Sequence, residues 1–120
     1  MSAMREKREY PRVPIEIFVH ENGSDEYYIH PAVNISPEGI HLVVDGVLEE
    51  DRLSSLEFTL PNGGRTIVVS ARVAWYEPQD EAVFRVGLHF TEISPEDRLA
   101  IEAYVESFQN AQLPDVAAAL

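Results

Sequence analysis

The sequence contains no cysteine, which excludes disulfides and thiolate metal sites. No apolar run approaches the length of a membrane-spanning helix, so we expect no membrane insertion. Residues 1–10 are rich in charge and no hydrophobic segment follows them, unlike a secretory signal peptide. Together these absences predict a soluble, cytoplasmic protein.

Positive charge is also scarce. The chain has 9 lysines and arginines against 21 aspartates and glutamates, a formal net charge of −12. So acidic a surface repels polyanions, which argues against a nucleic-acid polymer as the partner. The basic residues nevertheless gather near the N-terminus, where a small anion could be captured, although a solvated, disordered arm is the alternative interpretation. Four of the nine lie in the first dozen positions: Arg5, Lys7, Arg8 and Arg12.

Alternating apolar and polar residues, the period of a β-strand, run through most of the chain. Clusters of Gly, Pro, Asn and Asp separate these stretches and mark turns. We therefore predict six short strands, whose edges would be protected by closure into a small barrel. The predicted strands cover residues 13–20, 26–35, 40–44, 54–60, 65–76 and 82–90.

Strand alternation also predicts which side chains point into the barrel. In the second strand, Pro31 has no N–H to donate, which indicates an edge or a bulge. In the fifth, Trp75 continues the apolar series of Ile67 and Val73, so we expect it in the core, with base stacking as the alternative. For the second strand, the expected inward set is Tyr27, Ile29, Val33 and Ile35, and the outward set is Tyr28, His30, Asn34 and Ser36.

The pattern then changes to helical spacing, with apolar residues at Ile101, Tyr104, Val105 and Phe108. Ser94 suits the N-cap of this helix, and we expect the helix to end near residue 109. The fold class is therefore α+β and mainly β: a six-stranded antiparallel barrel with a C-terminal amphipathic helix. We expect a flexible basic arm over 1–12, the barrel and helix over 13–110, and a loosely ordered tail over 111–120.

Two short motifs stand out, one immediately before the first predicted strand and one at the end of the second. Arg8-Glu9-Tyr10-Pro11-Arg12 is an R-x-x-x-R sequence, and Asn34-Ile35-Ser36-Pro37-Glu38-Gly39 is an N-x-S-x-x-G sequence. The second arginine and the asparagine are 22 positions apart. In this order and spacing, the motifs resemble those of the PilZ family over about residues 5–108. The resemblance implies a PilZ-like barrel and a bacterial receptor for the second messenger cyclic di-GMP, with no other cofactor.

By this resemblance, the ligand site comprises Arg8, Arg12, Asn34, Ser36 and Gly39. Cyclic di-GMP carries guanines and phosphates, and a guanidinium fork matches both the O6/N7 edge of guanine and phosphate oxygens. Asn34 and Ser36 are two apart on a strand, so they share its outer face, and Gly39 permits close backbone approach. Without the arginines, these three could equally be ordinary turn-capping residues.

Further residues could border the ligand. Arg5 and Lys7 extend the basic arm, and residues near Lys7 could influence whether one ligand or a stacked pair binds. Trp75 could reach the ligand from the end of the barrel, and Gly87 lies on the outer face of the sixth strand, where a solvated face is the alternative. The four histidines show no metal-ligand spacing, so we predict no metal site.

The predicted function is binding and relay. A lone receptor domain has no output of its own, so we expect it to signal to an unidentified effector protein in motility, pilus or surface-polysaccharide (biofilm) systems. The alternative is a PilZ-like protein-interaction adaptor that binds no ligand, although all five motif positions are retained. We find no nucleophile motif, metal cluster or acid–base pair at a defined spacing, so we predict no enzyme activity.

Overall fold

The computed structural model describes residues 11–22, 27–45, 53–61 and 64–112. The tail over 113–120 and the arm over 1–10, with Arg5, Lys7 and Arg8, lie outside the described residues. Within them, no helix is long and apolar enough to cross a membrane. They form the strands β1 Val13–Pro14, β2 Phe18–Asn22, β3 Tyr27–Ser36, β4 Gly39–Asp45, β5 Leu53–Thr59, β6 Thr66–Asp80 and β7 Val83–Glu92, and the helix α1 Pro95–Gln112.

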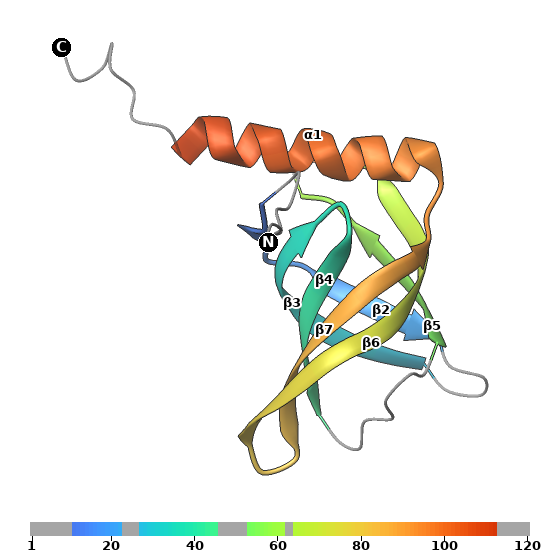
Figure 1. Ribbon diagram of the computed structural model, residues 1–120, viewed down its shortest axis with the longest axis vertical. Coiled ribbons are helices and arrows are strands. Elements are labelled where there is room, and N and C mark those ends of the chain that lie inside the picture. Colours follow the sequence, from blue (N-terminus) through green and yellow to red (C-terminus); the bar gives the residue numbers. More distant parts are fainter. Residues whose placement is uncertain (1–10, 23–26, 46–52, 62–63, 113–120) are drawn as a thin grey trace, which may run out of the picture.

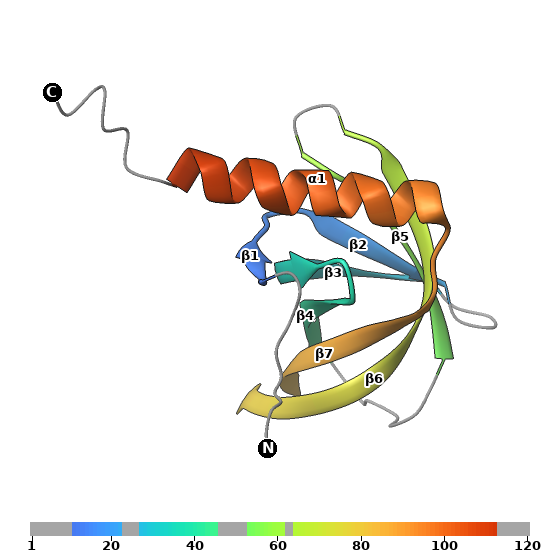
Figure 2. The same cartoon turned by 45° about the horizontal axis from the view of Figure 1, so that its top comes forward.

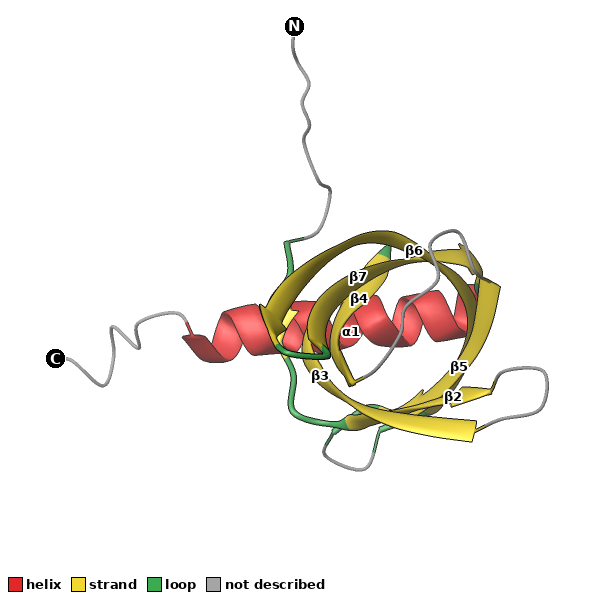
Figure 3. Ribbon diagram, turned by 90° about the horizontal axis from the view of Figure 1, so that it is seen from below, coloured by secondary structure: helices red, strands yellow, loops and turns green. Residues whose placement is uncertain are grey.

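Strands β2 to β7 close into an antiparallel barrel, which confirms the predicted fold class (Figure 1). The order in the sheet is β1-β3-β2-β5-β6-β7-β4, and a further pairing of β3 with β4 closes the ring. Seen from below, the strands surround a common axis with α1 behind them (Figure 3). Closure protects strand edges that would otherwise be open to other chains.

The first predicted strand is divided into β1 and β2. Both pair with β3, β1 near the C-terminal end of β3 and β2 near its N-terminal end. Between them the chain stays beside β3, because the Ile15 N–H donates to the Val33 carbonyl at 3.2 Å and the Ala32 N–H donates to the Ile17 carbonyl at 3.0 Å. The chain that follows the predicted arm therefore enters the fold beside the end of β3.

The apolar core fills the barrel, and α1 lies across one of its ends (Figure 1, Figure 2). Ile101 and Val105 of α1 are completely buried, as helical spacing predicted. The helix continues to Gln112, slightly beyond its predicted end near residue 109. The strands contribute buried residues that include Val19, Ile35, Ile40, Leu42, Leu56, Phe58, Ile67, Val69, Val86 and Leu88.

The predicted faces of β3 are wrong in its first half, and a β-bulge explains why. Ile29 is 53% exposed whereas His30 is 6% exposed, the reverse of the prediction. The register with β4 shifts between Ala32 and Asn34, and beyond the shift Ile35 is buried as predicted. An extra residue exchanges the two faces of a strand, so a single alternation cannot hold on both sides of it.

Trp75 was predicted to be in the core, and this is also wrong. The register of β6 with β7 shifts between Val73 and Trp75, so Ala74 is an additional residue in β6. Val73, before the shift, is 9% exposed, whereas Trp75, after it, is 40% exposed and lies on the outer wall.

The inward-facing His30 belongs to a buried polar cluster. His30 Nε2 lies 2.8 Å from Glu21 Oε1, and Ser54 Oγ donates to Glu21 Oε2 at 2.6 Å. Buried polar groups need such partners, because water no longer solvates them. The serine hydroxyl bonds to the carboxylate and not to the imidazole, so the three side chains do not have the geometry of a nucleophilic triad.

Polar contacts at its first turn fasten α1 to the barrel. The Asp97 N–H donates to Ser94 Oγ at 3.1 Å, which confirms the predicted N-cap. The Asp97 carboxylate accepts hydrogen bonds from Arg65 Nε at 2.6 Å and from the Val68 N–H at 3.3 Å. Burial raises the pKa of Asp97, but the hydrogen bonds from Arg65, Val68 and Ser94 and the charge of Arg65 outweigh it and lower the pKa below its ordinary value.

We predict that Asp97→Asn lowers the free energy of unfolding by about 1–2 kcal/mol at neutral pH, because it removes the ion pair with Arg65. The Arg65 side chain is 53% exposed, so solvent screening keeps the effect modest. Since the pKa of Asp97 is lowered in the folded state, its contribution is present above the ordinary aspartate pKa and is lost as pH falls through the folded-state pKa. Urea melts at neutral and acidic pH measure both effects.

Glu96→Gln is the matched control, because Glu96 is an exposed acid in the same helical turn with no ion pair to a described residue. Equal losses in the two variants would contradict the prediction. So would a difference between Asp97→Asn and wild type that persists unchanged into acid.

Candidate functional site

The predicted site residues that the structure describes lie along the outer wall of the barrel, but Ser36, which was predicted to face outward, is buried within its turn. Outward residues that pair in register form rows across neighbouring strands. Rows are about 7 Å apart along the strands, and adjacent strands are about 5 Å apart. From β3 through β4 and β7 to β6, the first row is Ser36, Gly39, His89 and Arg72, and the second is Asn34, His41, Gly87 and Trp75.

The turn between β3 and β4 is held by its own polar groups and by two neighbours. Ser36 Oγ accepts a hydrogen bond from the Glu38 N–H at 3.1 Å, and Ser36 is 1% exposed. The Phe90 N–H donates to the Glu38 carbonyl at 2.9 Å, and Arg98 Nη1 donates to the Pro37 carbonyl at 3.3 Å. Ser36 therefore caps the turn, the ordinary role considered for it from the sequence.

Arg12 lies against both ends of this turn. Its Nη1 donates to Asn34 Oδ1 at 3.2 Å, and its Nη2 is 3.4 Å from where a Cβ atom of Gly39 would stand. Gly39 itself has no room for that atom, because it would collide with the Leu88 carbonyl oxygen. The structure thus brings Arg12, Asn34 and Gly39 together from three separate segments.

Trp75 presents a flat aromatic surface on the same wall. Its indole ring covers Gly87, where a Cβ atom would collide with the ring. The His41 ring meets it edge-on, with a centroid distance of 4.8 Å and an interplanar angle of 81°. Gly87, considered from the sequence as bordering the site, contributes by making room for this ring.

His41 is a wall residue that sequence reasoning considered only as a metal ligand. It lies between Asn34 and Gly87 in the second row. The signal that could have found it is the alternation in β4, where Ile40 and Leu42 face the core and His41 must face outward. In the part of the chain that the structure describes, no three His, Asp or Glu side chains come together as metal ligands.

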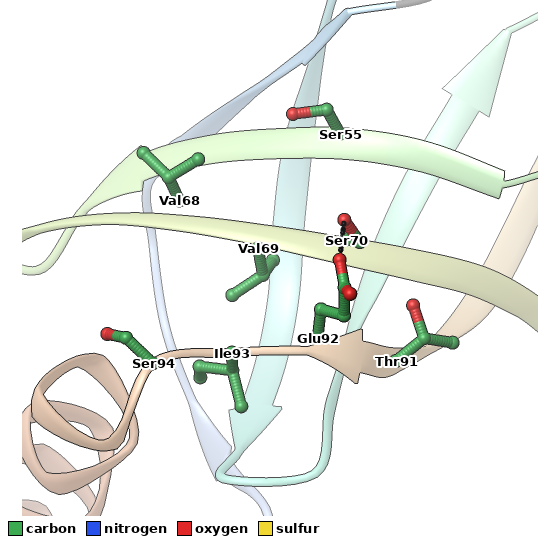
Figure 4. A pocket seen from close by; sticks show the side chains of 8 residues that line it. All are labelled: Ser55, Val68, Val69, Ser70, Thr91, Glu92, Ile93 and Ser94. Carbon is green, nitrogen blue, oxygen red and sulfur yellow. Dashed lines mark hydrogen bonds between the residues drawn. The ribbon is translucent and has the colours of Figure 1, made fainter.

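A separate groove of about 700 Å³ lies on β5, β6 and β7 beside the start of α1 (Figure 4). None of the described residues that line it is cationic, and Ser70 Oγ donates to Glu92 Oε1 at 3.4 Å. A carboxylate here disfavours a phosphate, so the wall around Arg12 is the better site for an anion. The lining residues are Ser55, Val68, Val69, Ser70, Thr91, Glu92, Ile93 and Ser94.

We predict that Gly87→Ala displaces the indole ring of Trp75, because the added methyl group would occupy the same space. Trp75 is the only tryptophan, so intrinsic fluorescence reports on it directly. Its emission maximum should shift to longer wavelength while the far-ultraviolet circular dichroism stays unchanged. Gly64→Ala, which adds a methyl group against Leu60 instead, is the control. An unshifted spectrum in Gly87→Ala would contradict the geometry.

Comparison with known proteins finds solved structures with a similar fold. The chain is similar to the Bacillus subtilis inhibitor of motility MotI/DgrA, with a TM-score of 0.82 and 22% identity over 92% of this chain and 55% of that one. It is also similar to the PilZ domain of YcgR from Escherichia coli with c-di-GMP (TM-score 0.70, 14% identity, 88% of this chain and 94% of that one). The K. pneumonia MrkH–c-di-GMP complex is a third similar structure (TM-score 0.72, 17% identity, 88% and 53%).

At these identities the likeness concerns the fold, and the chain spans about half the length of the MotI/DgrA and MrkH chains. No curated protein sequence matches it. The family model for the PilZ domain matches residues 6–107, a range that includes both motifs, the barrel and most of α1. This chain therefore belongs to the PilZ domain family.

Proposed function

We propose that this chain is a receptor for cyclic di-GMP, which it binds on the outer wall of the barrel beneath the arm that precedes β1. The observation that carries the proposal is the 3.2 Å hydrogen bond from Arg12 to Asn34, which joins the two sequence motifs across 22 residues. The structures of the YcgR PilZ domain and of MrkH with c-di-GMP support the same ligand here.

The side chains of the wall suit a guanine dinucleotide. The Arg12 guanidinium offers a planar fork of donors, and its bond to Asn34 orients that fork before a ligand arrives, which lowers the entropic cost of binding. Asn34 offers both donor and acceptor atoms. The exposed face of Trp75 suits the stacking of a base.

The proposal gives the arm over 1–12 the role of a clasp. Arg8 would contact the side of the ligand that faces away from the wall, and Arg5 and Lys7 would influence whether a second, stacked ligand is held. Fixing the arm costs about 1–2 kcal/mol per residue, which ligand contacts must offset. Closure of the arm and binding are therefore coupled, which is the requirement for a switch.

We propose α1 as the route from the site to an effector protein. Arg98 of α1 contacts the Pro37 carbonyl in the turn, and the Tyr104 hydroxyl donates to the Pro14 carbonyl at 3.0 Å, just after Arg12. A ligand that moves the turn or the arm would act on the helix through these bonds. Because MotI/DgrA is an inhibitor of motility, motility is the output that we favour over pilus or biofilm polysaccharide systems.

The alternative is a cytoplasmic PilZ-like adaptor that binds a protein without the nucleotide. The burial of Ser36 in its own turn favours this alternative, because that hydroxyl is not presented to a ligand. Arg12 and Asn34 favour the receptor. We propose no catalytic activity for either, since the hydroxyl of the Ser54–Glu21–His30 cluster is bonded to the carboxylate.

Isothermal titration calorimetry with cyclic di-GMP tests the receptor proposal. We predict that the wild type binds and that Arg12→Ala and Arg8→Ala each weaken binding at least about tenfold, because hydrogen bonds to charged groups contribute about 1.5–3 kcal/mol. Ser36→Ala should have a smaller effect, since its hydroxyl bonds within the turn. Arg65→Ala removes an arginine that is ion-paired beside α1 and is the matched control. No heat with the wild type would favour the adaptor.

Limited trypsin digestion tests the clasp. We predict that cyclic di-GMP slows cleavage after Arg5, Lys7 and Arg8, because a closed arm cannot enter the protease active site. The protection should be absent in Arg12→Ala at the same ligand concentration. If calorimetry shows binding but the cleavage rate does not change, the arm does not close and the receptor needs another switch.

A further inference from the structure

The arginines are unevenly distributed over the described part of this acidic molecule. Of the five that the structure describes, Arg65 and Arg98 are ion-paired with Asp97 and Glu102 at α1. The other three, Arg12, Arg72 and Arg85, lie on the outer wall formed by β4, β7 and β6 and the chain beside it. Three guanidinium groups thus gather on one wall of a chain whose formal net charge is −12, with Glu77 opposite one of them, Arg85.

Arg72 extends the first row of the wall beyond the turn. It is opposite His89, which is in turn opposite Gly39, so Arg72 lies about 10 Å, two strand spacings, from the site glycine. Its side chain is exposed and forms no ion pair with a residue that the structure describes. A free guanidinium at this distance can reach a ligand that also touches Arg12.

Arg85 lies on the other side of the second row. It stands two residues before Gly87 on β7, opposite Val43 of β4 and Glu77 of β6. Its Nε atom is buried and has no hydrogen-bond acceptor among the described residues. A buried guanidinium N–H without an acceptor costs free energy, and an anionic group bound on the wall would remove that cost.

Arg72 thus lies in the row on one side of Gly87 and Trp75, and Arg85 lies in the row on the other side. In a cyclic dinucleotide, each nucleoside has a phosphate on both its 3′ and its 5′ oxygen. The ribose of a base stacked on Trp75 therefore carries a phosphate at two of its oxygens, and an arginine on each side of the ring can contact one of them.

We propose that Arg72 and Arg85 are ligand-contacting residues that hold the phosphates on either side of the base over Trp75. The dinucleotide then spans the wall, with Arg12 and the turn at the β3 side and this arginine pair on β6 and β7. The inference rests on the proposed cyclic di-GMP function and extends the site beyond the two sequence motifs.

Calorimetry with cyclic di-GMP on Arg72→Gln, Arg85→Gln and the double variant tests this pair. Each single change should weaken binding about fivefold or more, and the double change more than either. Each lost phosphate contact should also make the affinity less sensitive to salt, because salt screens the attraction between the guanidinium and the phosphate. Arg85→Lys keeps the charge but not the fork, so it should bind better than Arg85→Gln and worse than wild type.

Ala103→Glu is the matched control. It changes the net charge from −12 to −13, as does each arginine-to-glutamine variant, but on the exposed face of α1. Its affinity should stay within about twofold of wild type. Equal weakening in this control would overturn the inference, because the effect would then be general electrostatics.

The outcomes separate this inference from the proposal on which it rests. If the wild type binds, Arg12→Ala binds at least about tenfold more weakly, and Arg72→Gln binds like wild type, the proposal for the arginine pair is wrong and the receptor proposal stands. If the wild type does not bind, the receptor and the pair both fail. Arg72 is exposed and forms no ion pair with a described residue, so Arg72→Gln should fold. Its affinity therefore tests the inference even if the Arg85 variants fail to fold.

Discussion

The pairing of β3 with β4 is the interaction on which the rest of the structure depends. It closes the ring of strands, and its register places Asn34 beside His41 and Ser36 beside Gly39. The bulge in the same pairing decides which residues of β3 face the core. The barrel and the candidate site therefore both depend on one set of backbone hydrogen bonds.

The arginines of this wall show how an acidic protein would bind the small anion that we propose as its ligand. The overall charge repels large polyanions, which extend over the whole surface, but a small ligand experiences mainly its nearest groups because salt screens the more distant ones. Strand registers collect Arg72 and Arg85 on the wall beside Arg12, while Arg65 and Arg98 are neutralised at α1. The same helix contacts the turn and β1, so hydrogen bonds join the proposed binding surface directly to the proposed output element.

Much of the fold and part of the site could be predicted from the sequence. Strand alternation located the barrel strands, and Ser94 marked the start of α1, because both signals depend on residues close together in the chain. The resemblance to the PilZ family predicted that Arg12 and Asn34 share a site, and a 3.2 Å hydrogen bond joins their side chains in the structure. Alternation and capping were sufficient for the strands and the helix, since neither signal needs a distant partner, whereas the link between Arg12 and Asn34 came from the family resemblance.

The sequence by itself thus determined the order of the strands and the helix. Only the tertiary structure decided which face Ile29, His30 and Trp75 occupy, because bulges arise where a strand must match partners distant in the sequence. It alone also set Arg65 against Asp97, 32 residues away. The physical reason is that cross-strand register depends on closure and packing of the entire barrel, which no local pattern encodes.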